Sequence, residues 1–181
     1  MTVWAPYVAL VLSAVLPADV PPQASPRVAV EVFSVGFPTS QDHRLRFARR
    51  EAPLVEGQNP DPLSRSLATG DAAAIAAIHS TSWRWERDGC IVVTYVAWMK
   101  EGQLGADARL LPPLSAPGPT DPLHPRPTQI RELDPLAHGL RHLAFLVRQD
   151  RDGALRQALG RRALAALSAF EPAVAGELRD P

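Results

Sequence analysis

The run 81–98 (TSWRWERDGCIVVTYVAW) constrains the fold of this 181-residue chain more strongly than any other part of it. Residues 81–87 and 90–98 are rich in β-branched and aromatic side chains, which are typical of strands. The Asp88-Gly89 pair between them tolerates the positive φ angles of a two-residue type I′ turn, whose twist matches that of paired strands. The run therefore predicts a β-hairpin.

The two-residue turn also predicts the register of this hairpin. Counting outward from the turn gives the opposing pairs Arg87–Cys90, Trp85–Val92, Trp83–Thr94, Thr81–Val96 and His79–Trp98. One predicted face is apolar and consists of Trp83, Trp85, Val92, Val96 and Trp98. The other face combines Ser82, Arg84 and Glu86 with Ile91, Val93 and Tyr95. Because both faces of the second strand are apolar, we expect a central strand that is covered on both sides.

A second hairpin is predicted before the first one. Residues 27–37 (RVAVEVFSVGF) have the composition of a strand, and residues 38–42 (PTSQD) are turn-forming. Residues 43–50 (HRLRFARR) alternate Leu45 and Phe47 with arginines, which indicates one dry and one solvated face.

Helices are indicated by Asp-Pro-Leu, which occurs at 61–63, 121–123 and 134–136. Aspartate is a good N-cap, and proline suits the first helical position. Residues 61–78 have a helical pattern that Thr69-Gly70-Asp71 divides, with Asp71 capping an alanine-rich second helix. Two C-terminal helices are predicted by apolar stripes, the first at Leu136, Leu140, Leu143 and Val147, the second at Leu155, Leu159, Ala163, Ala166, Leu167 and Phe170.

These elements predict an α+β fold, in which a small mixed or antiparallel sheet with a central Trp-rich hairpin is combined with short helices and a C-terminal two-helix cover. We expect one domain over residues 27–171. Within it, residues 111–128 contain seven prolines and form a long loop or polyproline segment. Residues 172–181 follow the domain as a tail.

Residues 1–26 form an apolar segment and a proline-rich linker. Val3–Leu16 (VWAPYVALVLSAVL) is too short to span a bilayer as a helix. No Lys or Arg precedes it, Pro6 interrupts it, and a cut after Ala18 leaves Leu16 where a signal peptide needs a small residue. We therefore expect a buried strand or short helix in a cytoplasmic protein, with a signal peptide over residues 1–18 as the alternative.

The charge balance and the cysteine count exclude several classes of function. Lys plus Arg and Asp plus Glu number 19 each, so there is no cationic surplus for nucleic acid. The single Cys90 rules out an internal disulfide and a cysteine-rich metal site. The chain has no Gly-x-Ser-x-Gly elbow, Walker A loop or dinucleotide fingerprint, and we predict no cofactor. The near-absence of lysine and asparagine is typical of a GC-rich bacterial genome.

His79 is the strongest single candidate for a functional residue. It lies where the alanine-rich segment meets the hairpin, flanked by hydroxyls and tryptophans. An imidazole there can act as a general base or contact a ligand. We favour a structural histidine that joins two elements, with serine and threonine satisfying backbone groups, because nothing nearby supplies an obvious nucleophile.

Two further groups of residues can be interpreted either as functional sites or as solvated surface residues. Arg44, Arg46, Arg49 and Arg50 can bind phosphate or carboxylate, or can form a solvated strand face near acidic residues. His138 and His142 have the i, i+4 spacing of metal ligands. We expect them to point to solvent, opposite the leucine stripe, and we predict no metal site, because no third ligand has a recognised spacing.

The order of hairpin, short helices, second hairpin, irregular loop and closing helix resembles the Nudix hydrolase scaffold. The residues behind the resemblance are the second hairpin (SWRWERDGCIVVTYVAW) and the helix opened by Arg131–Leu136. The resemblance covers about half of the chain, and its motifs are unspecific. The Mg²⁺-binding, glutamate-rich helix of that family has no counterpart, since residues 57–78 contain only Asp61 and Asp71 as acids. The resemblance implies a shared scaffold without pyrophosphohydrolase chemistry.

The sequence favours a non-catalytic module that binds a small ligand or a protein. Its predicted contact surface is the polar side of the central hairpin, with Ser82, Arg84, Glu86 and Tyr95, and His79 at its edge. The alternative is a hydrolase or transferase acting on a small phosphate or carboxylate substrate, with His79 as base and either Arg84 or Arg44, Arg46 and Arg50 as the anion clamp. Convergence of His79, Arg84 and Glu86 in a closed pocket favours the enzyme.

Overall fold

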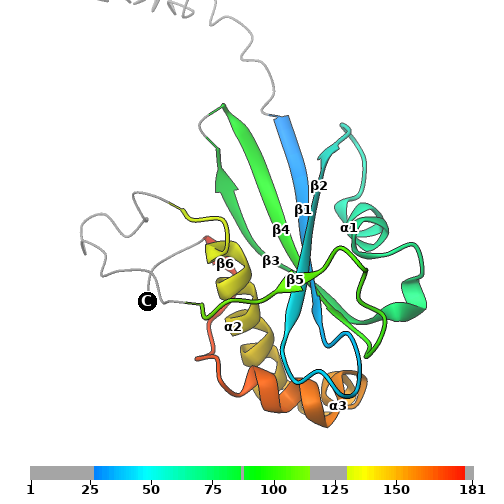
Figure 1. Cartoon of the computed structure of the whole chain (residues 1–181). Helices are drawn as coiled ribbons and strands as arrows, with labels where there is room; N and C mark the ends of the chain where they lie inside the picture. Colours follow the sequence, from blue (N-terminus) through cyan, green and yellow to red (C-terminus); the bar gives the residue numbers. More distant parts are fainter. Residues whose placement is uncertain (1–26, 87, 115–129, 178–181) are drawn as a thin grey trace, which may run out of the picture.

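A mixed β-sheet of six strands forms the framework of the protein (Figure 1). The structure is a computed structural model, and it describes residues 27–86, 88–114 and 130–177. The strand order is β5-β2-β1-β4-β3-β6. The strands are β1 (Arg27–Gly36), β2 (Arg46–Leu54), β3 (Ile75–Trp85), β4 (Cys90–Met99), β5 (Arg109–Leu110) and β6 (Gly176–Glu177).

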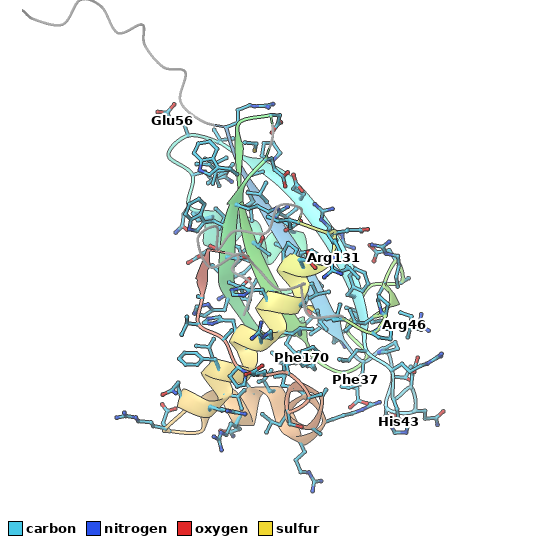
Figure 2. The ribbon with its side chains drawn as sticks, turned by 90° about the vertical axis from the view of Figure 1, so that its left-hand side faces the viewer. Phe37, His43, Arg46, Glu56, Arg131 and Phe170 are labelled. Carbon is cyan, nitrogen blue, oxygen red and sulfur yellow. The ribbon has the colours of Figure 1, made fainter. Side chains whose placement is uncertain are left out.

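Helices cover both faces of this sheet. Helix α1 (Pro60–Ala68) packs on one face, and the pair α2 (Asp134–Gln149) and α3 (Ala154–Leu167) covers the other. Figure 2 shows α2 lying along its face of the sheet. The predicted α+β fold with a C-terminal two-helix cover is confirmed. The sheet is mixed because β1 pairs with β2 and β3 with β4 in antiparallel fashion, whereas β1 and β4 are parallel.

The central hairpin exists, but its predicted two-residue turn is wrong. The Gly89 N–H donates to the Glu86 carbonyl at 3.0 Å, and the Glu86 N–H donates to the Cys90 carbonyl at 2.8 Å. Gly89 has a φ of +79°, and no described non-glycine residue, Asp88 included, has a positive φ. A type I′ turn needs positive φ at both central positions, so the chain instead forms a three-residue loop that ends on the left-handed glycine.

The longer loop shifts the register of the hairpin by one residue. Trp85 opposes Ile91, Arg84 opposes Val92 and Trp83 opposes Val93. A shift of one residue moves every side chain of a strand to the other face. Trp83 and Trp85 therefore lie on the α1 side, away from Val96 and Trp98, and Arg84 lies on the α2 side. An irregularity at Thr81 then pairs His79 with Val96 instead of Trp98.

The predicted second alanine-rich helix is also wrong beyond Ala74. Asp71 does cap Ala72–Ala74, accepting a hydrogen bond from the Ala73 N–H at 2.9 Å, but this is a single 3₁₀ turn. The residues 75–78 that follow are the first part of β3 and pair with the end of β4. Tertiary pairing overrides the helix preference of alanine there.

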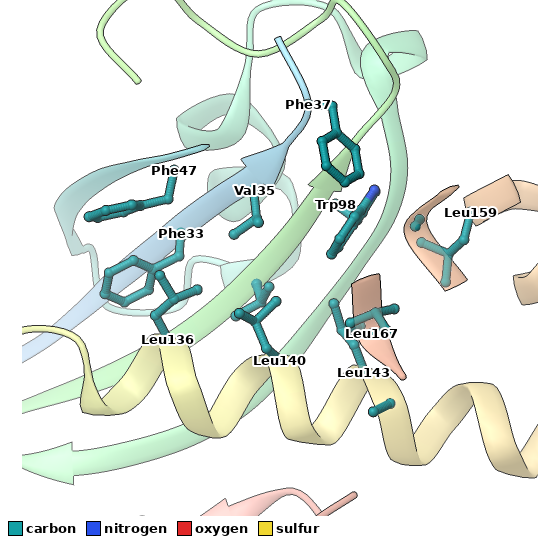
Figure 3. Close-up of a cluster of buried hydrophobic side chains, with 13 residues drawn as sticks. Phe33, Val35, Phe37, Phe47, Trp98, Leu136, Leu140, Leu143, Leu159 and Leu167 are labelled. Carbon is teal, nitrogen blue, oxygen red and sulfur yellow. The ribbon is translucent and has the colours of Figure 1, made fainter. Parts of the chain in front are cut away.

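The main core lies between the sheet and the C-terminal helices (Figure 3). Leu136, Leu140 and Leu143 are fully buried, which confirms the leucine stripe predicted for α2. They pack against aromatic and β-branched side chains from three strands, namely Phe33, Val35, Phe47, Val96 and Trp98. A smaller core on the α1 side contains Val30, Val32, Tyr95, Ala97 and Met99.

The predicted caps of two helices differ from those observed. Asn59, not Asp61, accepts the capping hydrogen bond of α1, from the Asp61 N–H at 2.9 Å. Asp134 is the first residue of α2, and its carboxylate accepts from the Arg131 N–H at 2.8 Å. The third predicted cap, Asp121, and the linker 1–26 lie outside the described residues, as do residues 115–128 of the proline-rich loop.

Candidate functional site

The first half of β3 lies beside β4 and has no strand on its other side in the described part of the chain. Strand β6 pairs with β3 only at Ser82 and Trp83. Residues 75–80 therefore form a free sheet edge, whose backbone N–H and C=O groups a further strand can pair, except for the Ser80 carbonyl that the His79 ring contacts. Two cavities flank this edge, one on each face of the sheet, and Ile78 and His79 line both of them.

The cavity on the α1 side is polar and has a volume of about 260 Å³. Helix α1 contributes Asp61, Ser64 and Arg65, which lie on one helix face because of their i, i+3 and i, i+4 spacing. Strands β3 and β4 contribute Ser80 and Tyr95 beside the two shared residues.

A hydrogen bond from Tyr95 fixes the floor of this polar cavity. The Tyr95 hydroxyl donates to Asp61 Oδ1 at 2.6 Å. Burial, together with the hydrogen bond and charge of Asp61, raises the pKa of Tyr95 well above its usual value. Tyr95 therefore stays protonated at neutral pH, and its single proton is engaged by Asp61.

Arg65 supplies a positive charge to the same cavity. It is exposed, and none of the described residues forms an ion pair or a side-chain hydrogen bond with it. A guanidinium with all its donors available can bind a carboxylate through two parallel hydrogen bonds.

The cavity on the α2 side has a similar volume, about 270 Å³, and a mainly apolar lining. Its walls come from β3, the end of α2 and the start of α3: Ala77, Leu143, Leu146, Gln149, Asp150 and Leu155. Asp150 is already engaged, because its carboxylate accepts from the Arg156 N–H at 2.8 Å. The site thus combines a charged cavity and an apolar cavity on either side of one strand.

His79 lies between the two cavities, at the exposed edge of β3. Its Nδ1 is 2.7 Å from the Ser80 carbonyl, and since a carbonyl only accepts, Nδ1 is the protonated nitrogen. The ring centroid lies 5.1 Å from that of His142. Nε2 of His79 is thereby left as a potential acceptor at the edge.

The prediction that His138 and His142 point to solvent is wrong. Both are buried, with exposed fractions of 8% and 4%. Gly139, between them, brings α2 so close to β3 and β4 that its neighbours are enclosed. His138 hydrogen-bonds to the backbone of Thr81, and His142 Nδ1 donates to the Ala173 carbonyl at 3.1 Å. Nε2 of each ring is buried without a hydrogen-bond partner in the part of the chain described.

Burial of these two histidines predicts an acid-sensitive fold. Burial is the main cause that lowers both pKa values, with nearby positive charge adding to it. The unfolded chain therefore takes up protons first as the pH falls. Stability should be complete above about pH 7 and decline below about 6.5, by at most about 1.4 kcal/mol per pH unit for each histidine.

Urea unfolding between pH 7.5 and 5.5 measures this slope. The His142→Gln variant should have a smaller slope than the parent protein, and the exposed His43→Gln should match the parent. Equal slopes in all three proteins would contradict the attribution of the acid sensitivity to the buried histidines.

Arg84 and Glu86 form a polar network with Glu31 on the α2 side of the sheet, where the nearby buried Ser82 Oγ has no hydrogen-bond partner among the described residues. Arg84 Nη1 and Nη2 donate to the fully buried Glu31 at 2.8 and 3.2 Å, and its Nε donates to Glu86 at 2.8 Å. Burial lowers the pKa of Arg84, but Glu31 and Glu86 outweigh burial and raise it. The predicted single contact surface is therefore split: the sheet separates Tyr95 from Ser82 and Arg84.

The arginines in and just before β2 do not gather into one anion site either. Arg44 and Arg46 each lie within 3.5 Å of Asp42, and Arg50 lies 2.8 Å from Asp107. Arg49 is on the opposite face of the strand, 2.6 Å from Glu31. Each guanidinium already has a carboxylate partner, which supports the solvated-face interpretation for Arg44, Arg46 and Arg50, whereas Arg49 bonds the buried Glu31.

Sequence reasoning missed several residues that the fold makes important. Ser64 and Arg65 gave no signal beyond their helical spacing with Asp61. Glu31 did give one, since it is the only charged residue between Val28 and Gly36 in a strand that is otherwise apolar. A lone charge in a buried strand indicates a buried partner of opposite sign.

The described residues contain neither a candidate metal site nor a membrane-spanning helix. Within the described ranges, no group of three or more His, Cys, Asp or Glu side chains is arranged to hold a metal ion. Of the helices in those same ranges, none has both the length and the apolar character needed to cross a bilayer. Comparison with models of protein families and with curated proteins finds no match to the chain.

Proposed function

We propose that this protein is a non-catalytic interaction module that binds an extended peptide segment of a partner protein along the free edge of β3. The observation behind the proposal is the combination of an unpaired edge, residues 75–80, with one cavity on each face of it. Strand addition at such an edge obtains affinity from main-chain hydrogen bonds and specificity from cavities for alternate side chains.

The spacing of the cavities matches the geometry of a strand. Successive side chains of an added strand point to opposite faces of the sheet. One side chain would thus enter the polar cavity of α1, and its immediate neighbour would enter the apolar cavity of α2 and α3. The two shared lining residues, Ile78 and His79, bring both openings to the same stretch of edge.

The lining chemistry specifies which side chains these are. Arg65 favours an acidic side chain in the α1 cavity, because its guanidinium donors are available there, whereas the Asp61 carboxylate is already bonded by the Tyr95 hydroxyl. Leu143, Leu146 and Leu155 favour an aliphatic side chain in the other cavity. The preferred ligand is a segment in which an aspartate or glutamate is directly followed or preceded by an aliphatic residue.

The placement of Arg84 gives less support to the alternative enzyme. That hypothesis needs His79 together with an arginine clamp and a carboxylate such as Glu86. Arg84 and Glu86 are bonded to each other, and Arg84 to Glu31, on the α2 side of the sheet, whereas the arginine at the His79 cavities is Arg65.

Selection of a displayed library of random 12-residue peptides on the full chain tests the proposal. Enriched peptides should contain the acidic–aliphatic pair. Methylation of their backbone nitrogens, one at a time, should weaken binding at every second position, because alternate N–H groups of an added strand pair with the edge. Failure to enrich any peptide, or tolerance of methylation at all positions, contradicts the proposal.

Substitution of Arg65 tests the charge of the α1 cavity. Arg65→Gln should weaken binding of an enriched acidic peptide about tenfold or more, because a charge-assisted hydrogen bond is lost. Arg161→Gln, an equal charge change at an exposed position on α3, should leave the affinity unchanged. Fluorescence polarisation of the labelled peptide measures both, and equal affinities of the two variants contradict the role of Arg65.

A further inference from the structure

The α1 side of the sheet has an apolar row at the end where β1 begins. The register aligns Leu54, Val28, Ile91 and Trp85 across β2, β1, β4 and β3. The next row toward α1 is also apolar and consists of Ala52, Val30, Val93 and Trp83. This surface is distinct from the edge described above, because it is a face of the sheet and includes neither cavity.

The Trp85 end of this apolar row is exposed in the described part of the chain, whereas Leu54, Val28 and Ile91 are half-buried. Trp85 is 53% exposed, Trp83 is 39% exposed, and Val55, which follows β2, is 68% exposed. Figure 1 shows this end of the sheet extending beyond α1, and Figure 2 places Glu56, the neighbour of Val55, at the same end. Two exposed tryptophans beside aliphatic side chains form the kind of patch that marks an interaction site.

The occupant we infer for this patch is the chain's own segment Val3–Leu16. It is the most apolar stretch of the sequence and contains no charged residue, so its burial desolvates no charge. Its sequence predicts a buried element, and the patch is an uncovered surface on which such an element can be buried.

The connection is long enough for the segment to reach the patch. The described chain begins at Arg27, one residue before Val28 of the apolar row. Pro17–Pro26 can span at most about 33–36 Å. Trp85 lies two strand spacings from Val28, about 10 Å away. A segment entering at this corner of the sheet can therefore cover the whole row without strain in the linker.

A nitroxide placed in the segment tests the contact in the full chain. Cys90→Ser removes the native thiol and Leu10→Cys supplies the attachment point, while the indole nitrogens are labelled with ¹⁵N. The indole N–H signals of Trp83 and Trp85 should lose most of their intensity compared with the reduced, diamagnetic sample. Trp98 is the internal control, since it lies on the other face of the sheet and seven residues, about 23 Å, along β4 from Ile91.

Two further samples distinguish the two possible occupants of the patch, the chain's own segment and a second copy of the chain. Adding Val8→Asp and Val11→Asp to the labelled chain should restore the Trp83 and Trp85 signals, because charged side chains oppose burial. Mixing nitroxide-labelled ¹⁴N protein with unlabelled ¹⁵N protein should leave these signals intact. Loss of signal in the mixed sample would assign the patch to a second copy of the chain, and full signals in the singly labelled chain would exclude the segment; either result overturns the inference.

Discussion

Replacing Glu31 with glutamine is expected to lower the free energy of unfolding by about 3–5 kcal/mol. Glu31 is fully buried, and its carboxylate accepts four hydrogen bonds. The donors are Arg49 Nε at 2.6 Å, Arg84 Nη1 at 2.8 Å and Nη2 at 3.2 Å, and Thr94 Oγ1 at 3.0 Å. Glutamine keeps the volume but leaves the buried Arg84 guanidinium without its main counter-charge, and a buried unpaired charge is strongly unfavourable.

Urea denaturation at pH 7 measures this loss, and two further variants identify its cause. Glu51→Gln removes an exposed carboxylate that also contacts Arg49, and it should change stability by less than about 1 kcal/mol. The double variant Glu31→Leu, Arg84→Met should recover much of the loss, because an apolar pair of similar volume can replace a buried ion pair. If Glu31→Gln lowers the free energy of unfolding by less than about 1 kcal/mol, the stabilising role of the buried network around Glu31 is contradicted.

The second large effect is expected from Gly139→Ala, at about 2–3 kcal/mol of destabilisation. Alanine normally stabilises a helix relative to glycine. At this position, however, a Cβ atom would overlap Cγ2 of Val96 and lie 3.3 Å from both Val96 Cβ and Thr81 Oγ1. Helix α2 would have to move away from the sheet, and the leucine stripe that packs beside Gly139 would lose contacts.

A double-mutant cycle with Val96→Ala tests the proposed overlap. In the Val96→Ala background the added methyl group finds space, so Gly139→Ala should cost much less there than in the parent protein. Because His138 and His142 lie on either side of Gly139, the single variant should also loosen their enclosure and reduce the pH dependence of stability. An equal cost in both backgrounds contradicts close packing of α2 on β4.

The elements could be predicted from sequence wherever local chemistry determines them. The leucine stripe of α2, the strand of residues 27–36 and the hairpin around Gly89 follow from periodicity and turn preference. The register of that hairpin could not be predicted, because Asp-Gly is compatible with both a two-residue and a three-residue loop. The one extra residue in the observed loop decides which face of the sheet carries Trp83, Trp85 and Arg84.

The candidate site was only partly accessible from sequence for the same reason. His79 and Tyr95 were selected from their surroundings in the chain, and both line the proposed binding site. Arg65 depends on the docking of α1 on β1 and β2, which brings it to the cavity beside β3. The parallel pairing of β1 with β4 places Glu31 beside Arg84. Both are long-range contacts that no local pattern encodes.

The most direct test of the central claim is the set of contacts between an enriched peptide and the full chain, measured as nuclear Overhauser effects between backbone protons. Strand addition predicts cross-strand effects from consecutive peptide residues to residues 75–80 of β3. It also predicts that the acidic side chain contacts Arg65 and its aliphatic neighbour contacts Leu146. Peptide contacts confined to Trp83 and Trp85, or the absence of any contact between peptide backbone and β3, would contradict the account.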